Sequence, residues 1–93
     1  MQKYTDKEHG WWVEIEGAAD TPMGELNRMY LDKMDAAWPI VQRLVKGSQL
    51  TDADGSAFSI ADVDVLRLSF RQWLWLRECV TKAMQEEITS GEA

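Results

Sequence analysis

Two residues in the chain are of types that often carry chemistry, a lone histidine and a lone cysteine. His9 falls in a polar turn with no second histidine and no cysteine near it, whereas a zinc site takes several nitrogen or sulfur ligands. Cys79 follows Trp75 and Leu76 on an apolar stretch, so we interpret it as a small buried residue rather than a nucleophile. We predict neither a zinc site nor a Cys–His catalytic pair.

An aspartate-rich segment at residues 52–56 resembles the start of a calcium-binding loop, because oxygen ligands alternate along it. Counting from Asp52, the position that requires glycine is Ala57, and the position that requires a bidentate glutamate is Val63. We therefore interpret the segment as a polar turn. The sequence also lacks a glycine-rich phosphate loop and a nucleophile elbow, so we expect no metal, no cofactor and no enzymatic activity.

Composition and charge limit the classes of function. The 93 residues suffice for one domain, and the formal net charge of −6 opposes non-specific binding to a phosphate backbone. This charge disfavours a small helical DNA-binding factor that would use Arg67 and Arg71. One cysteine cannot form an intramolecular disulfide, and the sequence shows neither a signal-peptide pattern nor a long apolar run. We expect a soluble cytoplasmic protein of a reducing compartment.

The first 17 residues predict a β-hairpin. A polar turn at residues 6–10 separates a short first strand from a second one, in which Trp11, Val13 and Ile15 share a face. A two-stranded hairpin is only marginally stable alone, so its apolar face must lie on a helix or its edge must pair with another chain.

A first helix is predicted over residues 21–46. Thr21 and Pro22 are typical of a helix start, and apolar residues recur from there at spacings of three and four. This stripe keeps its phase through Pro39, which projects opposite the stripe toward solvent, so we predict one helix kinked at the proline rather than two helices. Gly47 then matches the left-handed position that follows a helix end.

A second helix is predicted over residues 59–88, followed by a flexible tail at residues 89–93. Ser59 and Asp62 have the spacing of a capping box at its start. Its apolar residues cover about two-thirds of the circumference, more than a surface helix needs. We expect the first helix and one face of the hairpin to cover the side that carries Phe70, Trp73, Leu74 and Val80. The predicted fold is therefore α+β and mainly helical, with a short amino-terminal hairpin packed on two long antiparallel helices in one domain of residues 1–93.

The apolar residues of the second helix and the five tryptophans predict a contact surface, because aromatic anchors dominate interface energetics. We expect Trp11 and Trp73 in the core. Arg77 projects into an apolar face, where either its stem packs with its head in solvent, or it forms a buried ion pair or stacks on a tryptophan. The predicted partner-binding residues are Trp12, Trp38, Val65, Leu68, Trp75, Leu76, Arg77 and Cys79.

Three parts of the chain, taken in order, resemble a known family. They are the tryptophan-containing strand at residues 9–15, the helix start at residues 20–25 and the tryptophan-rich helix near the carboxyl terminus. Together they are similar to the small tail assembly chaperones of long-tailed, siphovirus-type bacteriophages. The resemblance implies a helical protein in the cytoplasm of a bacterial host that coats the hydrophobic tape measure protein, assists polymerisation of the tail tube and often oligomerises.

We therefore expect an acidic, tryptophan-rich protein–protein interaction protein whose partner is a hydrophobic helical segment or a second copy, and neither nucleic acid nor a membrane. The alternative is a small acidic inhibitor, encoded by a phage or plasmid, that occupies the active site or nucleic-acid site of a host protein. The two hypotheses differ in salt dependence. An acidic mimic loses affinity steeply with ionic strength, whereas an apolar helix contact holds or strengthens.

Overall fold

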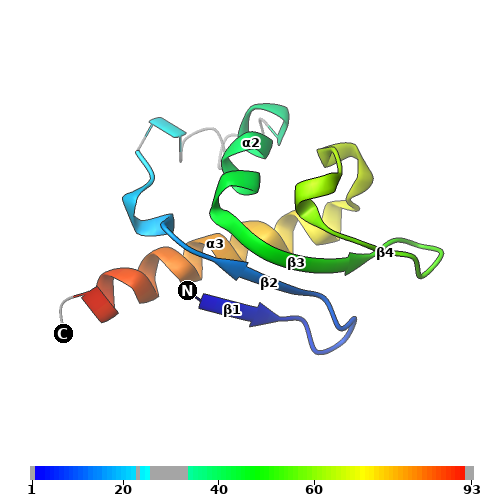
Figure 1. Cartoon of the computed structure of the whole chain (residues 1–93), viewed down its shortest axis with the longest axis horizontal. Coiled ribbons are helices and arrows are strands. Elements are labelled where there is room, and N and C mark those ends of the chain that lie inside the picture. Colours follow the sequence, from blue (N-terminus) through cyan, green and yellow to red (C-terminus); the bar gives the residue numbers. More distant parts are fainter. Residues whose placement is uncertain (1, 23, 26–33, 92–93) are drawn as a thin grey trace.

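A four-stranded antiparallel sheet, in the order β1-β2-β3-β4, forms one layer of the protein. The computed structural model describes residues 2–22, 24–25 and 34–91, and in Figure 1 the long helix α3 passes behind β2 and β3 while α2 stands at one side. The elements are β1 (Gln2–Thr5), β2 (Trp12–Ile15), the 3-10 helix η1 (Ala18–Asp20), α2 (Met34–Leu44), β3 (Val45–Thr51), β4 (Ala57–Phe58), the 3-10 helices η2 (Ile60–Asp62) and η3 (Val65–Arg67), and α3 (Phe70–Gly91).

This sheet corrects the predicted fold, which had only a hairpin and two long helices. Residues 45–51, predicted as a helix end and a loop, form β3 and give β2 a strand on its second side. Gly47 is no left-handed cap, because it pairs with Glu14 in the ladder. A Cβ atom there would lie 2.7 Å from Oε1 of Glu14, so a larger residue would require the Glu14 side chain to move. The extra strand stabilises a hairpin that is marginal alone.

The second helix begins at Phe70 rather than at Ser59. Ser59 makes no capping bond with its side chain, and two short 3-10 helices follow it. The capping box is formed instead by Ser69 and Gln72: the hydroxyl of Ser69 accepts the N–H of Gln72 at 3.1 Å, and Gln72 Oε1 accepts the N–H of Ser69 at 2.9 Å. This spacing is present in the sequence, so the correct helix start had a local signal.

Side chains of α2 explain why residues 60–67 do not join the long helix. Trp38 Nε1 donates to the carbonyl of Val63 at 2.9 Å, and Gln42 Nε2 donates to the carbonyls of Ile60 and Val63, both at 3.1 Å. Val63 itself is extended, with φ −129°. The carbonyl oxygens of this segment thus bond to a different helix, and the tertiary contacts override the local helical pattern.

The first predicted helix is described only in part, because residues 23 and 26–33 lie outside the described residues. Gly24 and Glu25 are helical, and α2 covers Met34–Leu44. Pro39 lies inside α2, and its side chain is exposed. This agrees with the predicted position of the proline, opposite the apolar stripe. The kink at Pro39 stays a prediction. At the other end of the chain α3 runs to Gly91, so the described part of the predicted tail is helical.

The core fills the space between the sheet, α2 and α3. Trp11 and Trp73 are both buried, which confirms their predicted place. Every layer contributes side chains that are almost wholly removed from water, so no layer can be lost without opening the core. The largest of them are Ile15 and Val13 of β2, Val41 of α2, Leu50 of β3, Ile60 of η2, and Trp73, Leu76 and Val80 of α3.

Gln72 fastens the start of α3 to the end of β3, because its Nε2 donates to the carbonyl of Thr51 at 2.7 Å while its side chain is buried. We predict that Gln72→Glu lowers the free energy of unfolding by about 1–3 kcal/mol. The glutamate keeps the capping acceptor but loses the donor to Thr51. Urea unfolding measures the change, and Gln85→Glu, an exposed change on the same helix, is the matched control. Equal stability of the two variants would contradict the prediction.

Candidate functional site

The turn between β1 and β2 is built around Asp6. Its Oδ2 pairs with His9 Nδ1 at 2.8 Å, and its Oδ1 accepts the N–H of Glu8 at 3.0 Å. The carbonyl of Asp6 accepts the N–H of Gly10 at 2.7 Å, and Gly10 has φ 77°, a left-handed conformation that favours glycine. These bonds hold the turn in one shape and fix the position of the His9 ring.

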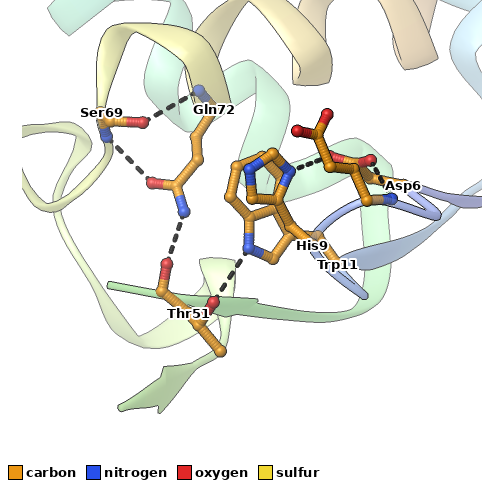
Figure 2. Close-up of polar contacts among 7 residues, drawn as sticks. Asp6, His9, Trp11, Thr51, Ser69 and Gln72 are labelled. Atoms are coloured by element: carbon orange, nitrogen blue, oxygen red, sulfur yellow. Dashed lines mark hydrogen bonds and ion pairs between the residues drawn. The ribbon is translucent and has the colours of Figure 1, made fainter. Parts of the chain in front are cut away.

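His9 lies flat against Trp11, with ring centroids 4.1 Å apart and ring planes 11° apart (Figure 2). Trp11 Nε1 donates to Thr51 Oγ1 at 3.0 Å, so the buried indole has its hydrogen-bond partner. The ring of Trp75 is tilted against Trp11 at 5.7 Å. Trp11 thus brings together the hairpin turn, the end of β3 and the first turns of α3.

Two shallow pockets adjoin each other at this junction and share His9, Trp11 and Arg71 as lining residues. The first has a volume of about 590 Å³ and extends toward the end of β3. The second has a volume of about 620 Å³ and extends along α3. The second is also lined by Asp6, Glu8, Phe70, Leu74, Trp75 and Glu78.

Large apolar side chains are exposed next to the second pocket. Phe70 is 67% exposed and Leu74 is 40% exposed, and they lie one turn apart on α3. Leu66, in η3, is 87% exposed. We name these three residues the apolar strip. Large apolar residues that are exposed together mark interaction sites more often than scattered single ones do.

Charged residues of both signs border the apolar strip. Arg71 and Glu78 are exposed on α3 and line the second pocket. Arg67 is held by Asp52, with Nη2 and Oδ2 2.8 Å apart. Among the residues that the structure describes, no ion pair involves Arg71 or Glu78. The strip therefore has one cation and one anion beside it, neither of which forms an ion pair with another described residue.

In the structure, α3 is rotated about its own axis relative to the prediction, so different residues are exposed. Of the eight predicted partner-binding residues, four lie in the core of the chain, namely Trp38, Val65, Leu76 and Cys79. The other four, Trp12, Leu68, Trp75 and Arg77, are partly exposed. Leu68 lines the first pocket and Trp75 the second, while Trp12 lies under Lys3, whose Nζ is 4.8 Å from the ring centroid. Only Leu68 and Trp75 of the predicted set reach the junction at Trp11.

Sequence reasoning missed the apolar strip, because it placed Phe70 and Leu74 on the side of the helix that the rest of the chain covers. An apolar arc as wide as that of α3 fits the core in more than one rotation. The tertiary structure decides between them, since Leu76 and Val80 are fully buried in the same core cluster as Val13 and Ile15 of β2 and Leu50 of β3. The width of the apolar arc alone does not indicate which rotation of α3 is adopted.

The aspartate-rich segment is the polar turn that the sequence predicts. Asp52 Oδ1 accepts the N–H groups of Asp54 at 2.9 Å and Ser56 at 3.0 Å, and Oδ2 pairs with Arg67. Both oxygens of Asp52 thus hold the turn and attach it to η3. In the described part of the chain, the group whose ligand atoms lie close enough for a metal ion is Asp6, Glu8 and His9, within 4.8 Å of one another. The bond between Asp6 and His9 accounts for this cluster without an ion.

No protein-family model, no curated protein and no solved structure matches the chain. Within residues 2–22, 24–25 and 34–91, no helix combines the length and the apolar character that crossing a bilayer requires. The candidate site in the described part of the chain consists of the apolar strip and the second pocket, which Phe70 and Leu74 line.

Asp6 and His9 give the turn a dependence on pH. Partial burial raises the pKa of Asp6, but the hydrogen bonds from His9 and from the N–H of Glu8 outweigh it and hold this pKa below its usual value. The stability that Asp6 contributes is therefore present above its unfolded pKa of about 3.9 and is lost as the pH falls through the lower folded pKa.

We predict that His9→Ala raises the pKa of Asp6 toward its ordinary value, as measured by NMR titration of the carboxyl carbon. The stability that Asp6 contributes above its unfolded pKa is then smaller, so less of it is lost in acid than in the unmodified protein. Lys7→Ala, an exposed change in the same turn, serves as the control and leaves the titration of Asp6 unchanged. An unshifted Asp6 in the His9 variant would show that the ring does not stabilise the carboxylate.

Cys79 is buried, and burial raises its pKa to about 12. We predict that a thiol reagent labels native Cys79 only as fast as the protein opens, and labels it at once in urea. A Gln85→Cys change in a Cys79→Ala background is the exposed control and reacts immediately. Above about pH 8.5 the unfolded thiol ionises first, so raising the pH destabilises the native state through this group. Rapid labelling of native Cys79 at neutral pH would refute its burial.

Proposed function

We propose that this chain is a non-enzymatic protein-interaction protein that binds a hydrophobic helical segment through the apolar strip of Leu66, Phe70 and Leu74. The observation that carries the proposal is the exposure of Phe70 and Leu74 one turn apart at the start of α3, with Leu66 exposed in the preceding η3. Transfer of such side chains from water to an apolar contact is favourable, and the sheet side of α3 already has its own cover.

The second pocket supports a helical partner. Phe70 and Leu74 border it, and the partly exposed ring of Trp75 supplies further apolar surface. An amphipathic helix presents apolar anchors three or four residues apart, which is the spacing of Phe70 and Leu74 themselves. The wall of the hairpin turn, held by Asp6, gives the pocket a fixed side against which a helix can dock.

The more specific form of the proposal is a tail assembly chaperone of a long-tailed bacteriophage, acting in the cytoplasm of the bacterial host. It is supported by the resemblance of residues 9–15 and 20–25 to that family, and its client, the tape measure protein, would supply the hydrophobic helix. The charges beside the strip are mixed, with Arg71 as well as Glu78. A mimic of nucleic acid would instead present acidic groups alone at its contact surface.

We predict that Phe70→Asp and Leu74→Asp each abolish capture of the tape measure protein encoded in the same phage genome, when the two proteins are co-expressed. Because Phe70 is 67% exposed, Phe70→Asp changes stability by no more than about 0.5 kcal/mol. Ile88→Asp is the matched control, since Ile88 is 56% exposed on the same helix but lies outside the strip.

The result that would overturn the proposal is full capture by both strip variants. The dependence of affinity on salt distinguishes this proposal from the acidic inhibitor. Affinity that comes from the strip stays constant or rises with ionic strength. A steep loss of affinity with salt, together with binding to a host enzyme or nucleic-acid-binding protein, would favour the acidic inhibitor.

A further inference from the structure

We propose that in the isolated protein the helix bound by the apolar strip is α3 of a second copy of this chain, arranged antiparallel across a two-fold axis. The inference rests on the proposed function, because it names a partner for the same surface. It commits to a symmetric dimer in which both copies use the same residues, which is the commonest form of protein oligomer.

The order of residues along α3 carries this inference. With successive residues 100° apart, Phe70, Arg71, Leu74 and Glu78 fall within an arc of about 100° on the exposed side. Arg71 and Glu78 are equally far in sequence from the midpoint between Leu74 and Trp75. A two-fold axis through that midpoint reverses one helix on the other and places Arg71 of each copy opposite the partner's Glu78. The same ion pair then forms twice.

The apolar residues fit the same axis. Leu74 and Trp75 stand on either side of it, so Leu74 of each copy lies opposite Trp75 of the partner copy. The ring of Phe70 extends past Glu78 of the partner subunit, where the contact removes the ring from water. This arrangement covers the exposed part of the strip that lies on α3 without moving any core residue, since Leu76 and Val80 stay on the sheet side.

The charges beside the strip favour a second copy of this chain over an unrelated partner whose contact surface carries charges of one sign. The two groups beside the axis have opposite charges, and among the described residues no ion pair within the chain involves either of them. Arg67, by contrast, is already paired with Asp52. A surface with one cation and one anion at equal distances from its centre is complementary to itself.

Sedimentation of the full chain over a range of concentrations at physiological ionic strength tests the dimer. We expect a monomer–dimer equilibrium that Arg71→Glu and Glu78→Arg each weaken by about 10-fold or more, because either reversal creates two like-charge contacts. The double variant R71E/E78R restores both pairs in reverse and brings the affinity back to within a few-fold of the original. Its composition equals that of the unmodified chain, so restoration cannot come from net charge.

The matched controls are Lys46→Glu and Glu16→Arg, which make the same charge changes at exposed positions outside the second pocket. Both leave the dimer unchanged. Circular dichroism of every variant confirms folding. A strict monomer at every concentration, or a double variant as weak as the single ones, overturns the inference.

The failure of the dimer and the failure of the proposed function are distinguishable. A monomeric protein whose strip variants still lose the tape measure protein refutes the second copy and supports the strip as a heterologous site. A dimer that shows the charge-swap pattern, with client capture unaffected by Phe70→Asp, supports the second copy and refutes the client contact.

Discussion

The indole of Trp11 is the contact on which the described surface depends. It is buried between the hairpin turn, the end of β3 and the start of α3, and its N–H bonds to Thr51. The side chain of Gln72 donates to the carbonyl of the same residue, Thr51. Gln72 also forms part of the cap at the start of α3 (Figure 2). Three segments far apart in sequence are thus fastened at one point, and the orientation of α3 follows from it.

That orientation has a direct consequence for function. Once Trp73, Leu76 and Val80 face the sheet, Phe70 and Leu74 must face outward. These two side chains and Leu66 form the surface that we propose to bind another helix. In that proposal the oppositely charged groups beside the strip set the register of the apolar contact, since charge pairs fix which residues meet more than they add affinity. Affinity and specificity would then come from different side chains of one helix face.

Several local features were readable in the chain, and others were overridden by distant contacts. The burial of Trp11 and Trp73, the polar turn at Asp52 and the exposed side of Pro39 followed from spacing and residue type. The strand β3 did not, because its stabilising partner, β2, lies some thirty residues earlier and pairs only in the folded chain. The break at residues 59–69 did not either, since the hydrogen bonds that cause it come from side chains of α2.

The sequence by itself determined which residues are apolar and that residues 6–10 form a polar turn, and it contains the capping-box spacing of Ser69 and Gln72, although the helix start was predicted at Ser59. Only the tertiary structure decided which side of that helix is covered. The reason is that an apolar arc wider than one helix–sheet contact can be buried in more than one rotation, and each rotation leaves different residues exposed. Packing against β2 and β3 selected the one that leaves Phe70 and Leu74 in water.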